Sequence, residues 1–284
     1  MESANLIKDL RAKTGAGFLD CKNALSESNN NLDEAVEYLR KKGLAKASKK
    51  TSREANEGAV GIYSNEKIIV IIKINSETDF AAKSDTFLNF IDQLGKLAIQ
   101  QNDVNLNKDN FLKINYNDGS ISDLINSMIA QIGENLILND LIIFPNQNNN
   151  FSFYIHNSYK NNIGKIVSYI SYNTDNNDDK IRNLCKNLCM HVAAMKPDSL
   201  DINDLDDKII QNEKKIQSEL ILSSGKPEKI VEKILEGKMS KFYSEVTFLN
   251  QKYILDQDKS VKDIIQPYTQ THNFKINSFK IITL

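Results

Sequence analysis

The chain has 284 residues, of which 40% are hydrophobic and 26% are charged, and its formal net charge at pH 7 is -1. This charge balance gives no general attraction to nucleic acid or to an anionic membrane, so we expect no direct binding of nucleic acid and no membrane association. No apolar run is long enough to cross a bilayer, and the first residues lack the basic and apolar regions of a signal peptide. We therefore expect a cytoplasmic protein with about one to three domains.

Residues 1–55 are expected to form a module of three short helices and a linker. The first helix stops at Gly15, and the third begins with a capping box of Asn31 and Glu34 and ends at Gly43. The spacing of apolar residues in the second helix places four side chains on its buried face: Phe18, Cys21, Ala24 and Leu25. A unit of this size has a thin core, which favours a module that docks on another protein.

Residues 56–145 are expected to form the first half of a core with mainly antiparallel strands. The expected elements are strands at 58–63, 68–75 and 136–144, a helix that begins after Ser84, and a helix over 121–132 that ends at Gly133. The first two strands are expected to pair as a hairpin about Asn65 and Glu66.

A polar stretch in this half, residues 76–83 with the sequence SETDFAAK, is the best candidate for a contact site. It places a carboxylate beside an aromatic ring on the turn before a helix. Phe80 can insert into an apolar pocket of a partner, and Asp79 can compete for hydrogen-bond donors or for a cation. The alternative is an ordinary turn with Phe80 folded back onto the core, because most aromatic side chains are buried.

Residues 146–284 are expected to form the second half of the core, after an asparagine-rich turn at 146–150. The expected elements are strands at 151–156 and 163–172, a helix over 178–195, a helical hairpin at about 202–247 that turns at 223–227, and a last strand over 274–284. The apolar stripe of the hairpin has two interpretations, which are contact between its own two helices and self-association of the protein.

Cys185, Cys189 and His191 lie close together on the helix expected over 178–195. Their side chains can bind a metal, but no fourth ligand accompanies them, so we expect buried thiols and neither a metal nor a cofactor. The sequence also lacks a phosphate-binding loop and a glycine-rich dinucleotide turn. These features favour a binding protein over an enzyme.

Three separated motifs carry a family resemblance. They are Thr78-Asp79-Phe80 after an apolar strand, the run TGAGFLDCKNAL over 14–25, and the run HVAAMKP over 191–197. Together they resemble bacterial elongation factor Ts, the nucleotide-exchange factor of elongation factor Tu. The resemblance implies an α+β fold with an N-terminal three-helix module similar to a ubiquitin-associated domain, a two-part core of mainly antiparallel sheets with helices, and a projecting antiparallel helical hairpin. It also implies that the C-terminal helical module of longer family members is absent.

The resemblance further implies which residues contact elongation factor Tu. The principal site, which dislodges the partner's magnesium ion, comprises Thr78, Asp79, Phe80, Ala81, Ala82 and Lys83. Further contacts are implied at Arg11, Phe18, Leu19, Lys22, Ile132, His156, Ile254 and Leu255. Ile132 also has the spacing of a core residue, and a lone histidine such as His156 is more often structural.

The function implied by the resemblance is guanine-nucleotide exchange in translation elongation. The protein would bind elongation factor Tu with GDP and promote GDP release, so that GTP can bind, without covalent chemistry or a cofactor. An alternative from another class is an interaction or chaperone-like module that acts through the N-terminal helices alone. Under that alternative, a fragment ending near Lys50 retains the activity.

Overall fold

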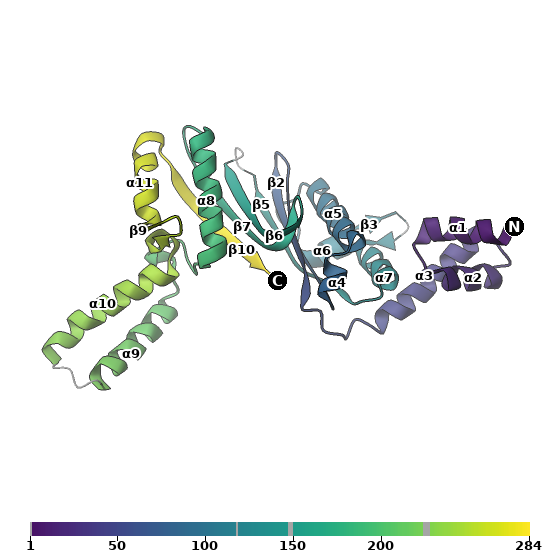
Figure 1. Cartoon of the computed structure of the whole chain (residues 1–284), viewed down its shortest axis with the longest axis horizontal. Helices are drawn as coiled ribbons and strands as arrows, with labels where there is room; N and C mark the ends of the chain where they lie inside the picture. Colours follow the sequence, from purple (N-terminus) through teal and green to yellow (C-terminus); the bar gives the residue numbers. More distant parts are fainter. Residues whose placement is uncertain (1, 118, 147–149, 224–227) are drawn as a thin grey trace. The chain divides into compact units, whose positions relative to one another are not determined.

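The structure is a computed structural model that describes residues 2–117, 119–146, 150–223 and 228–284. The chain divides into two compact units, the first made of residues 1–147, 157–166 and 283–284 and the second of 148–156 and 167–282. Helices and antiparallel strands occur together (Figure 1), which confirms the predicted α+β class. The predicted division of the chain after residues 55 and 145 stays a prediction.

The N-terminal helices form a small bundle, as the sequence predicts. They are α1 (Glu2–Thr14), α2 (Phe18–Glu27) and α3 (Leu32–Ser48). Their buried apolar side chains are Ile7, Leu10, Cys21, Ala24, Leu25 and Ala35. The Asn31 side chain caps α3 by accepting hydrogen bonds from the backbone N–H groups of Asp33 and Glu34.

The third helix extends beyond Gly43, where the sequence predicts its end, so that prediction is wrong. The helix continues to Ser48. A Cβ atom at Gly43 would lie 3.2 Å from the Cβ atom of Ala130 in α7 (Ile121–Ile132). Glycine therefore allows α3 and α7 to approach closely, and this tertiary contact overrides the local signal for a helix end.

The first unit contains an antiparallel sheet in the strand order β7–β1–β2–β5. Its strands are β1 (Glu57–Ser64), β2 (Ile68–Ser76), β5 (Leu136–Pro145) and the first residues of β7 (Ile163–Asn173). Pairing of Ser64 with Ile69 and of Glu57 with Ser76 confirms the predicted hairpin. Most residues of β1 and β2 are buried, so the sheet is a firm support for the turn that follows β2.

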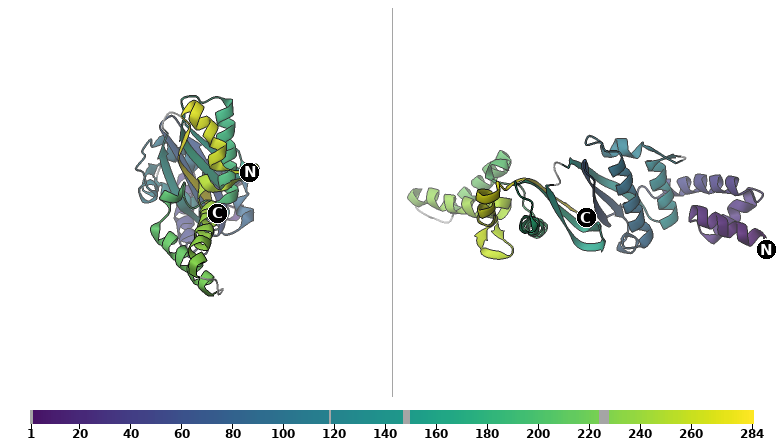
Figure 2. Two further views of the ribbon diagram at one scale, coloured as in Figure 1. Left: turned by 90° about the vertical axis from the view of Figure 1, so that its left-hand side faces the viewer. Right: turned by 90° about the horizontal axis from the view of Figure 1, so that it is seen from above.

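Helices α5 (Asp85–Gln100) and α7 pack on one face of this sheet (Figure 2), around a first apolar cluster that includes Phe87, Ile91 and Ile129. The Ser84 side chain caps α5, and Gly133 ends α7 with a φ of 89°. Both predicted boundaries are therefore confirmed. The shorter elements of this unit are α4 (Asp79–Ala82), α6 (Lys108–Leu112), β3 (Asn115–Tyr116) and β4 (Gly119–Ser120).

In the second unit, strands β6 (Phe151–Lys160) and β10 (Lys275–Thr283) both pair with β7. Helices α8 (Asp179–Met195) and α11 (Val261–His272) contribute to a second apolar cluster with these strands. Its largest side chains include Tyr172, Phe248 and Phe274.

Helices α9 (Asp207–Ser223) and α10 (Glu228–Val246) lie side by side (Figures 1 and 2) and form the predicted helical hairpin. Most of the predicted turn at 223–227 and residues 147–149 of the asparagine-rich turn fall outside the described residues. The short strands β8 (Lys252–Tyr253) and β9 (Asp256–Ser260) follow the hairpin. Within the described ranges, no helix has both the length and the apolar character needed to cross a bilayer.

Candidate functional site

The stretch after β2 forms a single turn of helix, α4. Thr78 caps this turn, because its hydroxyl oxygen accepts a hydrogen bond from the Ala81 N–H at 3.2 Å. Ala81 and Ala82 are buried, and Ala82 belongs to the first apolar cluster. Phe80 is 85% exposed. The alternative in which Phe80 folds onto the core is therefore wrong.

The support beneath Phe80 distinguishes it from other exposed apolar residues. Single apolar side chains are common on protein surfaces and need no functional explanation. Here the exposed ring is carried by a capped turn whose two alanines are buried, and one of them, Ala82, packs in the first apolar cluster. The side chain is thus presented from a defined position, as a contact residue requires.

Asp79 and Lys83 form an ion pair along the same turn, with 2.7 Å between Lys83 Nζ and Asp79 Oδ2. The hydrogen bond from Lys83 lowers the pKa of Asp79, and the same bond raises the pKa of Lys83. Both groups are therefore charged at neutral pH. Because exposed pairs of this kind contribute little to stability, Asp79 can exchange Lys83 for a donor on a partner.

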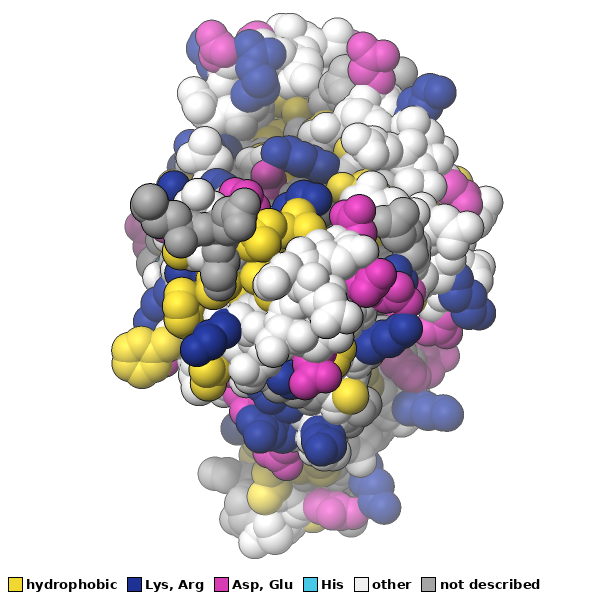
Figure 3. Space-filling model, turned by 90° about the vertical axis from the view of Figure 1, so that its right-hand side faces the viewer, with side chains coloured by type: hydrophobic (Ala, Val, Ile, Leu, Met, Phe, Trp, Pro, Cys, Tyr) yellow, Lys and Arg dark blue, Asp and Glu magenta, His cyan; other side chains and the backbone are white. Residues whose placement is uncertain are grey.

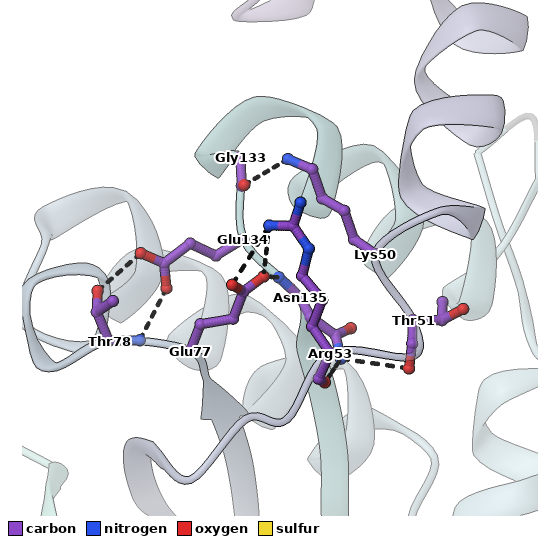
Figure 4. A network of polar contacts seen from close by, with 8 residues as sticks. All are labelled: Lys50, Thr51, Arg53, Glu77, Thr78, Gly133, Glu134 and Asn135. Carbon is purple, nitrogen blue, oxygen red and sulfur yellow. Dashed lines mark hydrogen bonds and ion pairs between the residues drawn. The ribbon is translucent and has the colours of Figure 1, made fainter.

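Two glutamates fix the base of α4 (Figure 4). Glu134, just after α7, accepts hydrogen bonds from the Thr78 N–H at 3.0 Å and from the Thr78 hydroxyl at 2.7 Å. Glu77 accepts a hydrogen bond from the Asn135 N–H at 2.6 Å. Each glutamate therefore binds the backbone of the segment that carries the other.

The chain segment between α3 and β1 joins the same network (Figure 4). The buried Asn135 donates from its side-chain amide to the Arg53 carbonyl oxygen at 2.7 Å. The Arg53 side chain lies 3.4 Å from the Glu77 carboxylate. Lys50 donates a hydrogen bond to the Gly133 carbonyl oxygen. Three separate stretches of the chain thus meet at the base of α4.

Sequence reasoning missed Glu77, Glu134 and Asn135 as supports of this turn. The only signal in the sequence is a polar residue, Asn135, just before an apolar strand. This signal does not indicate which residues form hydrogen bonds with Asn135. The contacts of Glu77 with Asn135 and of Glu134 with Thr78 join residues 58 and 56 positions apart. A local pattern cannot predict such contacts.

Ile132 lies close to this site. It is the last residue of α7, it is half-buried, and it packs on the first apolar cluster. The contact of Glu134 with Thr78 brings this end of α7 to the base of α4. The periodicity argument for a core residue is thus partly confirmed, and a role of Ile132 in partner contact stays a prediction.

The predicted contact residues of the N-terminal module lie at the surface of α1 and α2. Phe18 and Leu19 are 56% and 68% exposed, and Arg11 and Lys22 are exposed as well. The assignment of Phe18 to the buried face of α2 is therefore wrong. Phe18 is the first residue of α2, and the first side chain that α2 buries in the bundle core is Cys21, almost one turn later. On the face drawn in Figure 3, hydrophobic side chains gather at the surface among charged ones.

The remaining predicted contact residues belong to the second unit. His156 is exposed, and its Nδ1 lies 3.2 Å from the Tyr154 hydroxyl. Ile254 is half-buried against the second apolar cluster, whereas Leu255 is 59% exposed. Leu255 is thus available to a partner, and Ile254 anchors the segment that presents it.

A buried histidine supports the same segment. His191 Nδ1 accepts a hydrogen bond from the Ile254 N–H at 3.2 Å, and Nε2 lies 2.9 Å from Gln251 Oε1. Since Nδ1 is an acceptor, the ring proton is on Nε2 and points to Gln251. Burial lowers the pKa of His191, so the ring is neutral at pH 7.

Cys185 and Cys189 are buried in the second apolar cluster, as predicted. Burial raises the pKa of Cys185 to about 12 and also raises the pKa of Cys189. Both are therefore unreactive thiols of the core at neutral pH. Across the described part of the chain, no group of three or more His, Cys, Asp and Glu side chains is arranged to hold a metal ion.

The fold and the site define a class of protein that acts by binding a macromolecular partner. Phe80 is exposed on a fixed turn, and Phe18 and Leu19 are exposed on a small helical bundle. Comparison with known proteins gives the family, because the family model described as Elongation factor TS matches residues 77–284. The chain belongs to the elongation factor Ts family.

Relatives from several bacteria match over most of the chain. Elongation factor Ts of Halothermothrix orenii is 41% identical over 278 residues, which cover 96% of this chain and 89% of the relative. Elongation factor Ts of Clostridium acetobutylicum is 39% identical over 269 residues, covering 93% and 86%. That of Rickettsia typhi is 37% identical over 281 residues, covering 99% and 90%. The function of this family is nucleotide exchange on elongation factor Tu in translation elongation, without covalent chemistry.

Proposed function

We propose that this chain binds elongation factor Tu with GDP and promotes GDP release by inserting Phe80 into the partner near its magnesium site. The observation that supports this proposal is the exposure of Phe80 on a turn held by the core and by Glu134. A fixed support matters, because an inserted side chain displaces partner groups only if it does not itself yield. The magnesium ion is the partner's, where it neutralises phosphate charge.

One aromatic side chain does not supply the whole effect. Acceleration of release by about ten-thousand-fold requires a barrier lower by roughly 5.5 kcal/mol. Burial of one phenylalanine contributes about 1.5 to 3 kcal/mol. Phe18, Leu19 and Leu255 offer further exposed apolar area. We assign these residues to the grip on the partner and Phe80 to the displacement.

Asp79 extends the proposal to the electrostatics of the partner's site. Its carboxylate is already charged and oriented by Lys83 at 2.7 Å. A hydrogen-bond donor of the partner that turns to Asp79 leaves the network that holds the partner's magnesium ion. The ion is then bound less tightly, and so is the nucleotide whose phosphate charge it neutralises. By thermodynamic reciprocity, bound nucleotide weakens the grip of the exchange factor, which permits turnover.

The release rate of a fluorescent GDP from elongation factor Tu, measured with the parent and with Phe80→Ala, tests this proposal. We expect strong acceleration by the parent and a loss of about tenfold or more in the variant, because truncation removes roughly 1.5 to 3 kcal/mol of apolar contact in the transition state.

Val104→Ala is the matched control, since Val104 is an exposed apolar residue in the connection between α5 and α6. It should leave the release rate unchanged. Equal acceleration by the parent and by Phe80→Ala would exclude insertion of this side chain. A folded parent that gives no acceleration would exclude the function itself.

A further inference from the structure

Glu77 and Glu134 form a reciprocal clamp beneath α4, in which Glu134 holds Thr78 and Glu77 holds Asn135. We infer that this clamp positions Phe80 for nucleotide exchange, so that Glu77 and Glu134 are positioning residues of the exchange site. The inference rests on the proposed function of Phe80, because it concerns the support of that side chain.

The clamp begins where the backbone pairing of the sheet ends. Ser76, the last residue of β2, pairs with Leu136, the first residue of β5, and no further strand pair follows at this end of the two strands. Just beyond them, the N–H groups of Thr78 and Asn135 donate to carboxylates (Figure 4) instead of to strand carbonyl oxygens. The hydrogen bonds of the two glutamate side chains thus continue the connection between the two chain segments beyond the last strand pair, as far as Thr78 at the start of the turn.

Glu134 uses both of its carboxylate oxygens on Thr78. Oε2 accepts from the Thr78 N–H at 3.0 Å, and Oε1 accepts from the Thr78 hydroxyl at 2.7 Å. The Thr78 hydroxyl oxygen accepts in turn from the Ala81 N–H at 3.2 Å. A continuous chain of hydrogen bonds therefore runs from the end of α7 into the turn that carries Phe80.

The other half of the clamp is closed by the segment before β1. The Glu77 side chain is only 20% exposed, and Arg53 Nη1 lies 3.4 Å from its carboxylate. Asn135 receives further support, because its buried amide donates to the Arg53 carbonyl oxygen at 2.7 Å. Hydrogen bonds to a charged acceptor are stronger than those between neutral groups, so carboxylates suit this supporting role.

Glutamine is the sharpest replacement at both positions. It keeps the shape of the glutamate side chain, but it offers one acceptor oxygen and an NH2 group that only donates. In Glu134→Gln, one of the two Thr78 donors therefore loses its acceptor. If Glu134 only stabilises the fold, Glu134→Gln lowers the free energy of unfolding whether or not Phe80 is present. If Glu134 positions Phe80, Glu134→Gln slows exchange in the parent but not in a protein that already carries Phe80→Ala.

The first experiment measures GDP release from elongation factor Tu as a function of factor concentration, with the parent and with Glu134→Gln. We expect the rate at saturating factor to fall about three- to tenfold, and the half-saturating concentration to change less, because the grip residues are intact. In the Phe80→Ala background, Glu134→Gln should cause no further loss. Glu66→Gln, in the turn at the opposite end of β1 and β2, is the matched control.

The second experiment needs no partner. The chain contains no tryptophan, so Phe80→Trp introduces a single tryptophan on α4, whose fluorescence reports on this position alone when it is excited selectively over the tyrosines. Time-resolved anisotropy should show a larger amplitude of local motion when Glu134→Gln or Glu77→Gln is added, and no change when Glu66→Gln is added. Urea unfolding of each variant identifies any general loss of stability.

The outcomes separate the two proposals. An unchanged anisotropy and an unchanged saturating rate in Glu134→Gln would overturn the clamp while leaving the role of Phe80 intact. Equal losses from Glu134→Gln in the parent and in the Phe80→Ala background would also overturn it, because the effect would not pass through Phe80. If the parent gives no exchange, the proposed function fails, and the anisotropy alone decides whether the clamp fixes the turn.

Discussion

Asp79 lies next to Phe80 on α4, but its contribution is expected to be electrostatic and not apolar. In the free protein its carboxylate is held by Lys83 through a hydrogen bond of 2.7 Å. The pair is exposed on both sides, so its loss has little effect on the free energy of unfolding. A substitution at this position can therefore separate an effect on exchange from an effect on folding.

For Asp79→Asn we expect GDP release to slow severalfold, and the free energy of unfolding to stay close to that of the parent. The amide keeps the size of the side chain but removes the charge that attracts a donor. Asp92→Asn is the control, because Asp92 forms the same type of pair with Lys96 at 2.6 Å in α5. Stopped-flow release and urea unfolding provide the two measurements. Exchange at the parental rate in Asp79→Asn would assign the whole effect to Phe80.

At the scale of helices and strands, the boundaries that the sequence predicts correctly are those set by local chemistry. Ser84 caps α5 and Gly133 ends α7, since an acceptor side chain and a left-handed residue each act within one turn. Gly43 carries the same signal as Gly133 but lies inside α3, because its environment is set by Ala130 of α7. The exposure of Phe80 could not be predicted from a local pattern either, because a single helical turn is too short to show the periodicity that separates buried from exposed positions.

The contact of α5 with β1 depends on another glycine. A Cβ atom at Gly95 would overlap the ring of the buried Tyr63. We therefore expect Gly95→Ala to lower the free energy of unfolding by about 1 to 3 kcal/mol, because an overpacked core forces side chains and backbone to shift.

The same substitution in α10 should have the opposite effect. Apart from the neighbouring backbone of its own helix, a Cβ atom at Gly237 would meet no atom within 4 Å, and alanine favours the helix by roughly 0.8 to 1.0 kcal/mol. Urea unfolding of Gly95→Ala and Gly237→Ala side by side tests the contrast. A Gly95→Ala protein as stable as the parent would mean that α5 does not pack this closely on Tyr63.

At the scale of the whole molecule, the stability of the fold depends on pH in two ranges, an acidic one set by aspartates and one nearer neutral pH set by His191. Asp123, Asp178 and Asp263 accept hydrogen bonds at the starts of helices, which lower their pKa values from 3.8. Their contribution is present above that value and is lost as pH falls through the lower folded-state pKa. Burial lowers the pKa of His191 from 6.5. Below that pH the unfolded chain binds the proton before the folded chain does, so stability falls as pH falls.

We accordingly expect the free energy of unfolding to decrease between about pH 7 and pH 5, with a slope from His191 of at most about 1.4 kcal/mol per pH unit, the limit for one proton. His191→Gln should lower the stability but flatten this window, because its side chain stays neutral. Urea unfolding at several pH values measures both proteins. A slope that persists in His191→Gln would show that the proton binds elsewhere, and that the buried ring between Gln251 and Ile254 is not the group that makes the fold sensitive to acid in this range.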